Sequence, residues 1–385
     1  MPDMDAKVSG AAVVLGVDGL DALVGLLVAG GYRTIGPRVE EGAVVYGPVR
    51  GVADLPAGYV DEQAPGSYRL TRKKDGKALF DWTVGPHSWK RYLYPPEQLL
   101  FRAERRGGGF SVLPAAEEES PLAFIGVRPC ELAAIAVHDR VFSGSGVVDP
   151  GYAGRRDGAF LVAVNCTRAG GTCFCPATGT GPRARTGFDL ALTEIEDGKR
   201  HLFVVETGSE RGAALLARLK APPADGALLA TVTRLTRKAA KAMVRDVPKD
   251  TPQVLKRNLD SPRWDDVAAR CLGCANCTLV CPTCFCATVE DTTDLSGGVA
   301  ERWRRWDSCF TSDFSYIHGG VIRREIRSRY RQWLTHKLAT WSDQFGVGGC
   351  TGCGRCITWC PVGIDITEEA RAIRAGEGRA GEGRR

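Results

Sequence analysis

The sequence lacks a hydrophobic run long enough to cross a membrane. The apolar stretch 22–31 is much shorter than the ~20 residues that a transmembrane helix needs, and Asp18 and Asp21 precede it. The first residues carry Asp3 and Asp5 where a secretory signal has basic residues. We therefore expect a cytoplasmic protein without membrane insertion.

Several signatures of catalysis and of nucleotide binding are also missing. The glycine-containing segment 179–187 has neither the dinucleotide-binding fingerprint nor the Gly-Lys-Ser/Thr of a phosphate-binding loop. No Ser/His/Asp set or carboxylate pair stands out by spacing, and nothing indicates a nickel site or a flavin fingerprint. The basic pairs 73–74 and 304–305 lack the aromatic interleaving of a nucleic-acid module. We expect no catalytic residue and no nucleic-acid partner.

Neither sign of charge dominates the chain. Its 385 residues include 51 Lys or Arg against 45 Asp or Glu, a formal charge of +6 that counts every thiol as neutral. What the sequence has in abundance is cysteine, with 15 residues. In a cytoplasmic chain of this length so many thiols indicate metal binding before disulfides. Each oxidised 4Fe–4S core with its four thiolates carries about −2, so three clusters would bring the net charge near zero.

The N-terminal region, 1–245, reads as α/β with a partly parallel sheet. Leu122–Val127 and Phe160–Val164 are short apolar runs typical of buried strands, and Pro129 suits the first turn of the helix between them. Such a β-α-β unit places its two strands in parallel. Further helices are predicted at 19–32 and 212–220, and further strands at 43–46 and 201–207.

The C-terminal region has a different character. We predict a linker at 246–260, a mainly α-helical dicluster ferredoxin domain at 261–372 and a disordered tail at 373–385. A helix at 322–340 carries apolar residues along one face. Residues 301–340 hold nine Arg or Lys against four Asp or Glu, some of which could shield cluster charge.

Two cysteine runs carry the clearest signal, because each has the bacterial ferredoxin spacing C-x₂-C-x₂-C-x₃-C-P. In two-cluster ferredoxins the fourth cysteine of each run ligates the other cluster. The predicted ligands of the first 4Fe–4S cluster are Cys271, Cys274, Cys277 and Cys360. Those of the second are Cys350, Cys353, Cys356 and Cys281. Structural zinc is the competing interpretation, which two complete runs ending in Cys-Pro disfavour.

A third 4Fe–4S cluster is predicted in the α/β region. Two of its cysteines follow the parallel strands, where ligands of such sheets bind, and two lie in the glycine-rich loop that comes next. The four are Cys130, Cys166, Cys173 and Cys175. Buried free thiols and zinc are the alternatives. Three further cysteines stay unassigned, namely Cys284, Cys286 and Cys309.

The residues that surround these cysteines resemble a known family. The resemblance rests on Gly85–Lys90 with Pro95-Pro96, Gly126–Glu131, Asn165-Cys166, Cys173–Cys175, Gly179–Pro182, Trp306–Cys309, His336-Lys337 and both ferredoxin runs. Together they resemble the iron–sulfur β subunit of cytoplasmic sulfhydrogenase-type NiFe hydrogenases and, similarly, the iron–sulfur subunit of anaerobic sulfite reductase that shares this architecture. There is no clear departure at these positions, which span about 85–365.

The resemblance implies an electron-transfer subunit that does not turn over alone. Its partners would be a flavin subunit that exchanges hydride with NAD(P)H and the small and large subunits of a NiFe hydrogenase. The alternative is the same relay in a sulfite or sulfur reductase complex, which the sequence does not distinguish because that chemistry belongs to the partners. An interpretation of another class is a zinc-stabilised assembly or nucleic-acid protein.

Overall fold

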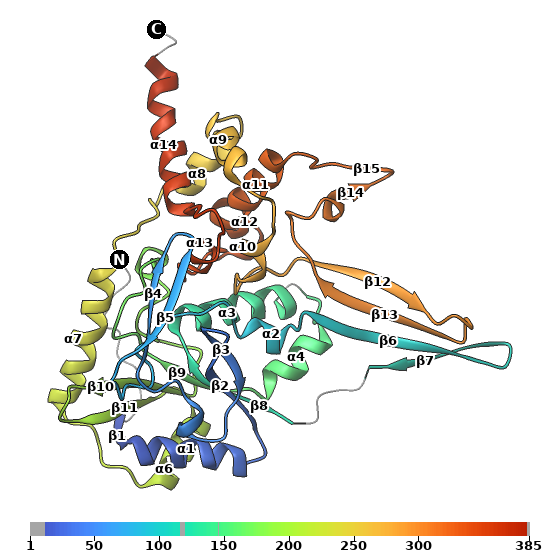
Figure 1. Cartoon of the computed structure of the whole chain (residues 1–385). Helices are drawn as coiled ribbons and strands as arrows, with labels where there is room; N and C mark the ends of the chain where they lie inside the picture. The colour runs from blue at the N-terminus through green and yellow to red at the C-terminus, as the bar shows by residue number, and fades with distance from the viewer. Residues whose placement is uncertain (1–11, 116–119, 145, 383–385) are drawn as a thin grey trace.

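The structure is a computed structural model that describes residues 12–115, 120–144 and 146–382. The N-terminal segment with Asp3 and Asp5, on which the expectation of no secretory signal rests, lies outside these residues. Figure 1 shows an α/β part below, a cysteine-rich part above it, and a long arm of strands that leaves the body between them. No helix of the described ranges is both long and apolar enough to span a bilayer.

A seven-stranded mixed sheet forms the centre of the α/β part. Its strands, in spatial order, are β1 (Ala12–Gly16), β11 (His201–Thr207), β10 (Leu190–Glu196), β9 (Phe160–Val164), β8 (Leu122–Val127), β2 (Arg33–Glu40) and β3 (Ala43–Pro48). The four central strands from β10 to β2 run parallel, whereas the edge pairs are antiparallel. The predicted parallel pairing of 122–127 with 160–164 is confirmed, and every residue of both strands is buried, as expected of a parallel sheet covered on both faces.

Helices surround this sheet, and some of them pack directly against its strands. They are α1 (Val17–Ala29), α2 (Lys90–Leu93), α3 (Pro129–Ser143), α4 (Pro150–Asp157), α5 (Cys175–Thr178), α6 (Glu210–Leu219) and α7 (Gly226–Ala242), with a short 3-10 helix at Val52–Asp54. The helices predicted at 19–32 and 212–220 are α1 and α6. Pro129 starts α3 directly after β8, as predicted, so Cys130 lies in the first turn of a helix at the sheet edge. A small hairpin, β4 (Tyr59–Ala64) with β5 (Ser67–Arg72), lies beside this region.

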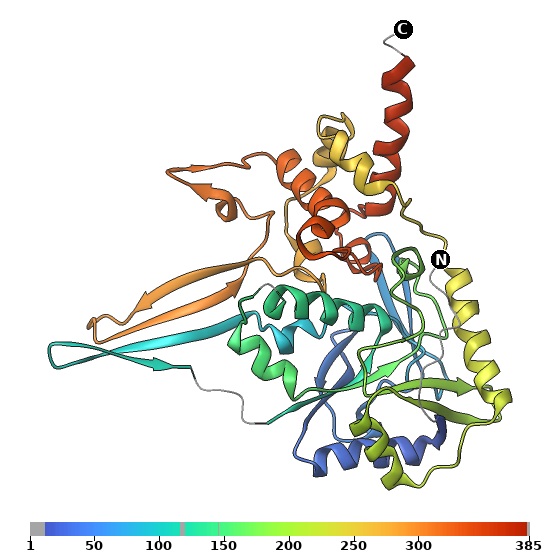
Figure 2. The ribbon, with the colours of Figure 1, turned by 180° about the vertical axis from the view of Figure 1, so that it is seen from behind.

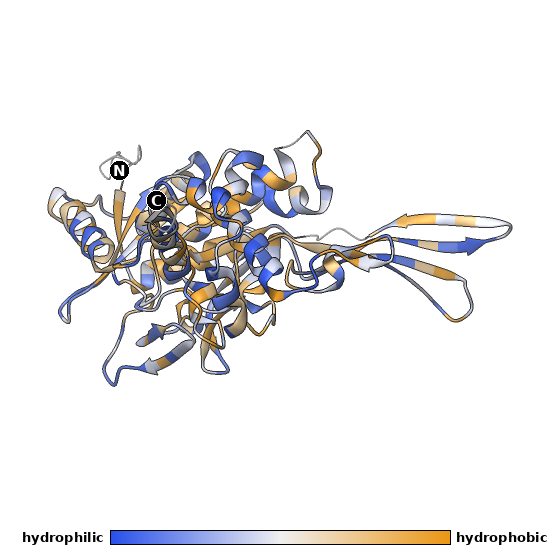
Figure 3. Cartoon of the chain, turned by 90° about the horizontal axis from the view of Figure 1, so that it is seen from above, coloured by the Kyte–Doolittle hydropathy of each residue, from blue (hydrophilic) through white to orange (hydrophobic). Residues whose placement is uncertain are grey.

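The arm is a four-stranded antiparallel sheet assembled from both halves of the chain. Its order is β12 (Ala287–Thr293), β13 (Val299–Trp306), β6 (Glu97–Arg106) and β7 (Gly109–Pro114). Figure 2 shows the same arm from behind, and Figure 3 shows that polar and apolar residues both lie along it. The arm therefore joins the insert between the ferredoxin runs to the N-terminal half, which the sequence did not predict.

The cysteine-rich part contains helices and strands. Its helices are α8 (Thr251–Arg257), α9 (Arg263–Arg270), α10 (Asn276–Leu279), α11 (Ile326–Thr335), α12 (Trp341–Phe345), α13 (Arg355–Thr358) and α14 (Ile366–Glu382). A π-helical turn, His336–Thr340, continues α11, so the helix predicted at 322–340 is present from Ile326 onward. A 3-10 helix (Asp313–Ser315) and a small hairpin, β14 (Tyr316–Ile317) with β15 (Gly320–Val321), precede it.

Both ends of the predicted C-terminal domain differ from expectation. Residues 246–260 include α8, whose Val254 and Leu255 are buried in one apolar cluster with Trp264 and Ile373. This segment is thus part of the core of the cysteine-rich part and not a separate linker. Helix α14 also continues through the described part of the predicted disordered tail 373–385, as far as Glu382, and its Ile373 packs into that same cluster.

Candidate iron–sulfur centres

The two ferredoxin runs build the same local backbone. Gly273 and Ala275 in the first run, and Gly352 and Gly354 in the second, all have positive φ angles, between +62° and +77°. This conformation turns backbone N–H groups toward the sulfur atoms, as in other anion-binding turns. The N–H of Gly273 donates to Sγ of Cys271 and that of Gly352 to Sγ of Cys350, each at 3.4 Å. The small residues between the cysteines are therefore needed for the backbone to wrap around sulfur.

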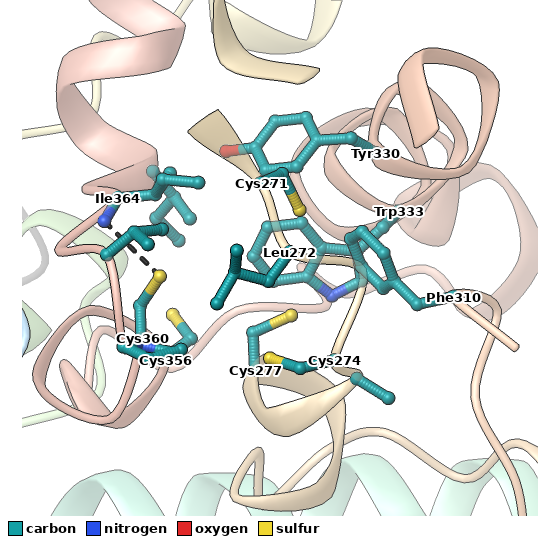
Figure 4. A pocket seen from close by; sticks show the side chains of 14 residues that line it. Cys271, Leu272, Cys274, Cys277, Phe310, Tyr330, Trp333, Cys356, Cys360 and Ile364 are labelled. Atoms are coloured by element: carbon teal, nitrogen blue, oxygen red, sulfur yellow. Dashed lines mark hydrogen bonds between the residues drawn. The ribbon is translucent and has the colours of Figure 1, made fainter. Parts of the chain in front are cut away.

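The first cavity brings the predicted first ligand set together. It is lined by Cys271, Cys274, Cys277, Cys356 and Cys360 together with apolar side chains. Figure 4 shows these thiols around a common space, with Tyr330, Trp333 and Phe310 beside them. Cys360 reaches this cavity from the end of the second run, and its sulfur accepts a hydrogen bond from the N–H of Ile364 at 3.3 Å.

Two side chains that line this cavity carry buried polar atoms without a partner in the described part of the chain. The hydroxyl of Tyr330 and the indole Nε1 of Trp333 are buried and have no hydrogen-bond partner among the residues that the structure describes. Buried donors are normally paired, so each such atom needs an explanation. The sulfide and thiolate sulfurs of an iron–sulfur cluster accept hydrogen bonds of this kind. The donors, the thiols and the apolar walls therefore fit a 4Fe–4S cluster.

The second ligand set lies between the two others. Sγ of Cys281 lies 3.3 Å from the hydroxyl of Thr283, which donates to the carbonyl of Gly349 at 2.7 Å, so Cys281 lies close to the start of the second run. Lys337, which is only 3 % exposed, places its Nζ 3.5 Å from Sγ of Cys281. Although burial by itself disfavours the charged form, the thiols of Cys281 and Cys284 raise the pKa of Lys337 above its usual range.

A separate cavity forms at the edge of the parallel strands, and we call it the third cavity because it holds the third predicted ligand set. It is lined by all four predicted cysteines, Cys130, Cys166, Cys173 and Cys175, and also by Cys353 of the second run. The glycines around it leave room that a side chain would fill. A Cβ atom on Gly170 would lie 2.9 Å from Sγ of Cys173, and one on Gly181 would lie 3.0 Å from Sγ of Cys175. This surrounding of four thiols and close backbone fits a further cluster.

Burial disfavours the thiolate form of most of these cysteines unless a nearby positive charge or bound iron stabilises it. It raises the pKa of Cys173 and Cys350 to about 12, and raises that of Cys130, Cys277 and Cys356 well above the usual range. Iron is bound by the thiolate, so loading with metal must displace protons from these groups. No three His, Cys, Asp or Glu side chains within the described ranges are arranged to hold a single metal ion.

Buried cations stand beside the cavities and favour negative charge there. Arg128 contacts Sγ of Cys166 at 3.9 Å and donates to the backbone carbonyl oxygens of Phe80 and Trp82. Burial raises the pKa of Cys166, and the positive charge of Arg128 counteracts this effect. Arg128 belongs to the motif Gly126–Glu131, but its role was not predicted. The role of Lys337 was not predicted either. Its position gave a signal, since it is a charged residue on the apolar face of its helix.

A buried ion pair connects the second ferredoxin run to the α/β part. Arg355 donates to Glu131 at 2.7 Å, and the two side chains are 0 % and 1 % exposed. The hydroxyl of Tyr46 donates to the other carboxylate oxygen of Glu131, also at 2.7 Å. Arg355 in addition donates to the carbonyl of Gly85 at 2.8 Å. Since Glu131 adjoins Cys130, this contact fixes the third cavity against the second ligand set.

Comparisons with known proteins agree with this arrangement of cysteines. Residues 270–364 match the family described as a 4Fe-4S dicluster domain. The chain is thus an iron–sulfur protein of the 4Fe–4S dicluster class. It is also 30 % identical, over 344 residues, to sulfhydrogenase 2 subunit beta of Pyrococcus furiosus, an alignment that covers 88 % of this chain and 95 % of that protein. The chain therefore belongs to the family of sulfhydrogenase β subunits.

Proposed function

We propose that this chain relays electrons through three 4Fe–4S clusters, held by the three predicted ligand sets. The arrangement of the second ferredoxin run carries the proposal. Cys356 of that run lines the first cavity, and Cys353 lines the third. The second ligand set thus lies between the other two, and the three sites form one continuous path. Each cluster, when bound, accepts and releases a single electron.

The residues of the chain prepare this path in two ways. Apolar walls such as Phe310 and Trp333 exclude water from the first site. Buried cations, Arg128 at the third site and Lys337 at the second, offset the negative charge of thiolate-bound iron. Ligation, burial and local charge are the means by which a protein tunes such centres. The chain supplies a conducting path, and catalysis takes place on other chains.

We further propose the two ends of the path. One partner is a flavin subunit that exchanges hydride with NAD(P)H, and the other is a NiFe hydrogenase module with its small and large subunits. The family membership and the resemblance in the sequence support this assignment. Purification of the native complex tests it. We expect stoichiometric nickel and a flavin to copurify, whereas siroheme would instead indicate the sulfite or sulfur reductase complex.

Iron content tests the third cluster directly. Anaerobically purified protein should contain about twelve irons and about twelve sulfides, with a brown absorbance that dithionite bleaches. We expect Cys175→Ser to lose about a third of this iron, because Cys175 lines the third cavity, while the first two clusters keep their spectra. Unchanged iron in this variant would contradict the third ligand set. Stoichiometric zinc without sulfide in the wild type would contradict all three.

The charge of Lys337 should raise the reduction potential of the second cluster. Reduction adds negative charge, which a buried ammonium 3.5 Å from a ligand sulfur stabilises. We expect Lys337→Met to shift that potential to a more negative value in a redox titration followed by electron paramagnetic resonance. Lys256→Met is the control, because Lys256 is surface-exposed and pairs with Asp343. Equal potentials in both variants would contradict a role for Lys337.

A further inference from the structure

Two cysteines outside the three ligand sets meet at the base of the arm. Strands β12 and β13 pair in a register that places Ala287 opposite Trp306. The N–H of Asp307 then donates to the carbonyl of Cys286 at 2.9 Å, so the chain carries Cys309 back toward Cys286. Each of the two cysteines shifts the pKa of the other, as expected of neighbouring side chains, and both are partly exposed. The hairpin thus brings together two cysteines that are 23 residues apart in the sequence.

Two buried ammonium groups stand beside this pair. Lys90 is 4 % exposed, its Nζ donates to the carbonyl of Cys284 at 3.1 Å, and it lies 3.7 Å from the centre of the Trp306 ring. Lys337 approaches from the other side through Thr283, to whose hydroxyl oxygen it donates at 2.8 Å. Neither lysine forms an ion pair with a carboxylate among the described residues. A buried cation requires a nearby negative charge, which the thiols can supply as thiolates.

The environment divides the pair into a thiolate and a thiol. The hydrogen bond with Cys309 lowers the pKa of Cys286 to about 7, and the charges of Lys337 and Lys90 act in the same direction. The same hydrogen bond raises the pKa of Cys309. A partly exposed, low-pKa cysteine beside a second cysteine is the arrangement of thiols that form disulfides reversibly.

We propose that Cys286 and Cys309 form a redox-active dithiol–disulfide couple that exchanges electrons with the relay. This inference rests on the proposed function, which supplies the electrons. Reduction breaks the Cys286–Cys309 S–S bond, consumes two electrons and one proton, and yields the Cys286 thiolate and the Cys309 thiol; oxidation reverses each of these changes. The electrons arrive one at a time along the path that includes Cys281, which shares Lys337 with the pair. The proton comes from solvent, to which both cysteines are partly exposed.

The couple is tested on the full, cluster-loaded chain by trapping its thiols. Protein is poised with mediators at an oxidising or a reducing potential, treated with iodoacetamide, denatured and cut with trypsin. Arg302, Arg304 and Arg305 lie between the two cysteines, so their fragments stay together only through a disulfide. We expect joined fragments after oxidation and two separate, alkylated fragments after reduction with dithionite. In Cys309→Ser, Cys286 should be alkylated at both potentials.

Iron and sulfide content distinguishes this couple from a further metal centre. We expect Cys286→Ser and Cys309→Ser to keep the wild-type iron and sulfide, since neither cysteine belongs to a proposed ligand set. Loss of iron from either variant would overturn the couple in favour of metal ligation. Separate, alkylated fragments at both potentials in the wild type would also overturn it. Failure of the relay has a different readout, namely wild-type protein whose visible absorbance dithionite does not bleach.

Discussion

Replacing Cys360 by serine is expected to remove the cluster of the first ferredoxin run, although Cys360 belongs to the second. We expect a loss of about four of about twelve irons. The physical reason is that Cys360 lines the first cavity together with Cys271, Cys274 and Cys277. Its sulfur also accepts a hydrogen bond from the N–H of Ile364, which fixes the thiol toward that cavity. Iron analysis with electron paramagnetic resonance of the reduced protein gives the number and identity of the remaining clusters.

The control for this variant is Cys309→Ser, which makes the same chemical change at a thiol outside the proposed ligand sets. We expect it to retain all the iron. If Cys360→Ser instead lost only the signal that belongs to residues 350–356, the crossed ligation would be wrong, and each run would hold its own cluster. Lys337→Met identifies which electron paramagnetic resonance signal belongs to the second cluster, because only the potential of that cluster should change in this variant.

Replacing Arg355 by methionine is expected to lower the free energy of unfolding by about 3–5 kcal/mol. The substitution leaves the carboxylate of Glu131 buried without its cation. The free-energy cost of this unpaired buried charge is larger than the net stabilisation that the intact ion pair provides. Because Arg355 joins the second run to Gly85 and Glu131, the contact between the two parts of the chain should weaken first. Unfolding in urea, followed in parallel by tryptophan fluorescence and by cluster absorbance, measures both effects.

Arg305→Met is the matched control for the loss of Arg355. Arg305 also forms ion pairs, with Glu97 and Glu290, but these lie on the exposed arm. Exposed pairs contribute little because water and salt screen them. We therefore expect Arg305→Met to unfold at nearly the wild-type urea concentration. Similar midpoints for the two variants would contradict the structural role of the buried pair.

Much of the α/β part was predictable because its signals are local. The strands at 122–127 and 160–164 are continuous apolar runs of the length of buried strands, and Pro129 marks the helix start between them. The arm was not predictable in this way. Strands β6 and β13 pair across about two hundred residues of sequence, and neither carries a pattern that names its partner. The helix α8 was also missed, since only Val254 and Leu255 in a polar segment mark its buried face.

The sequence by itself determined the chemistry of the sites. Cysteine spacing of two and three residues is a local property, and backbone turns at Gly273 and Gly352 follow from it in each run separately. Only the tertiary structure decided how the sites relate to one another. It brings Cys353 to the third cavity, places Lys337 beside Cys281, and holds Cys286 against Cys309. These contacts depend on the packing of segments distant along the chain, which no spacing within one motif encodes.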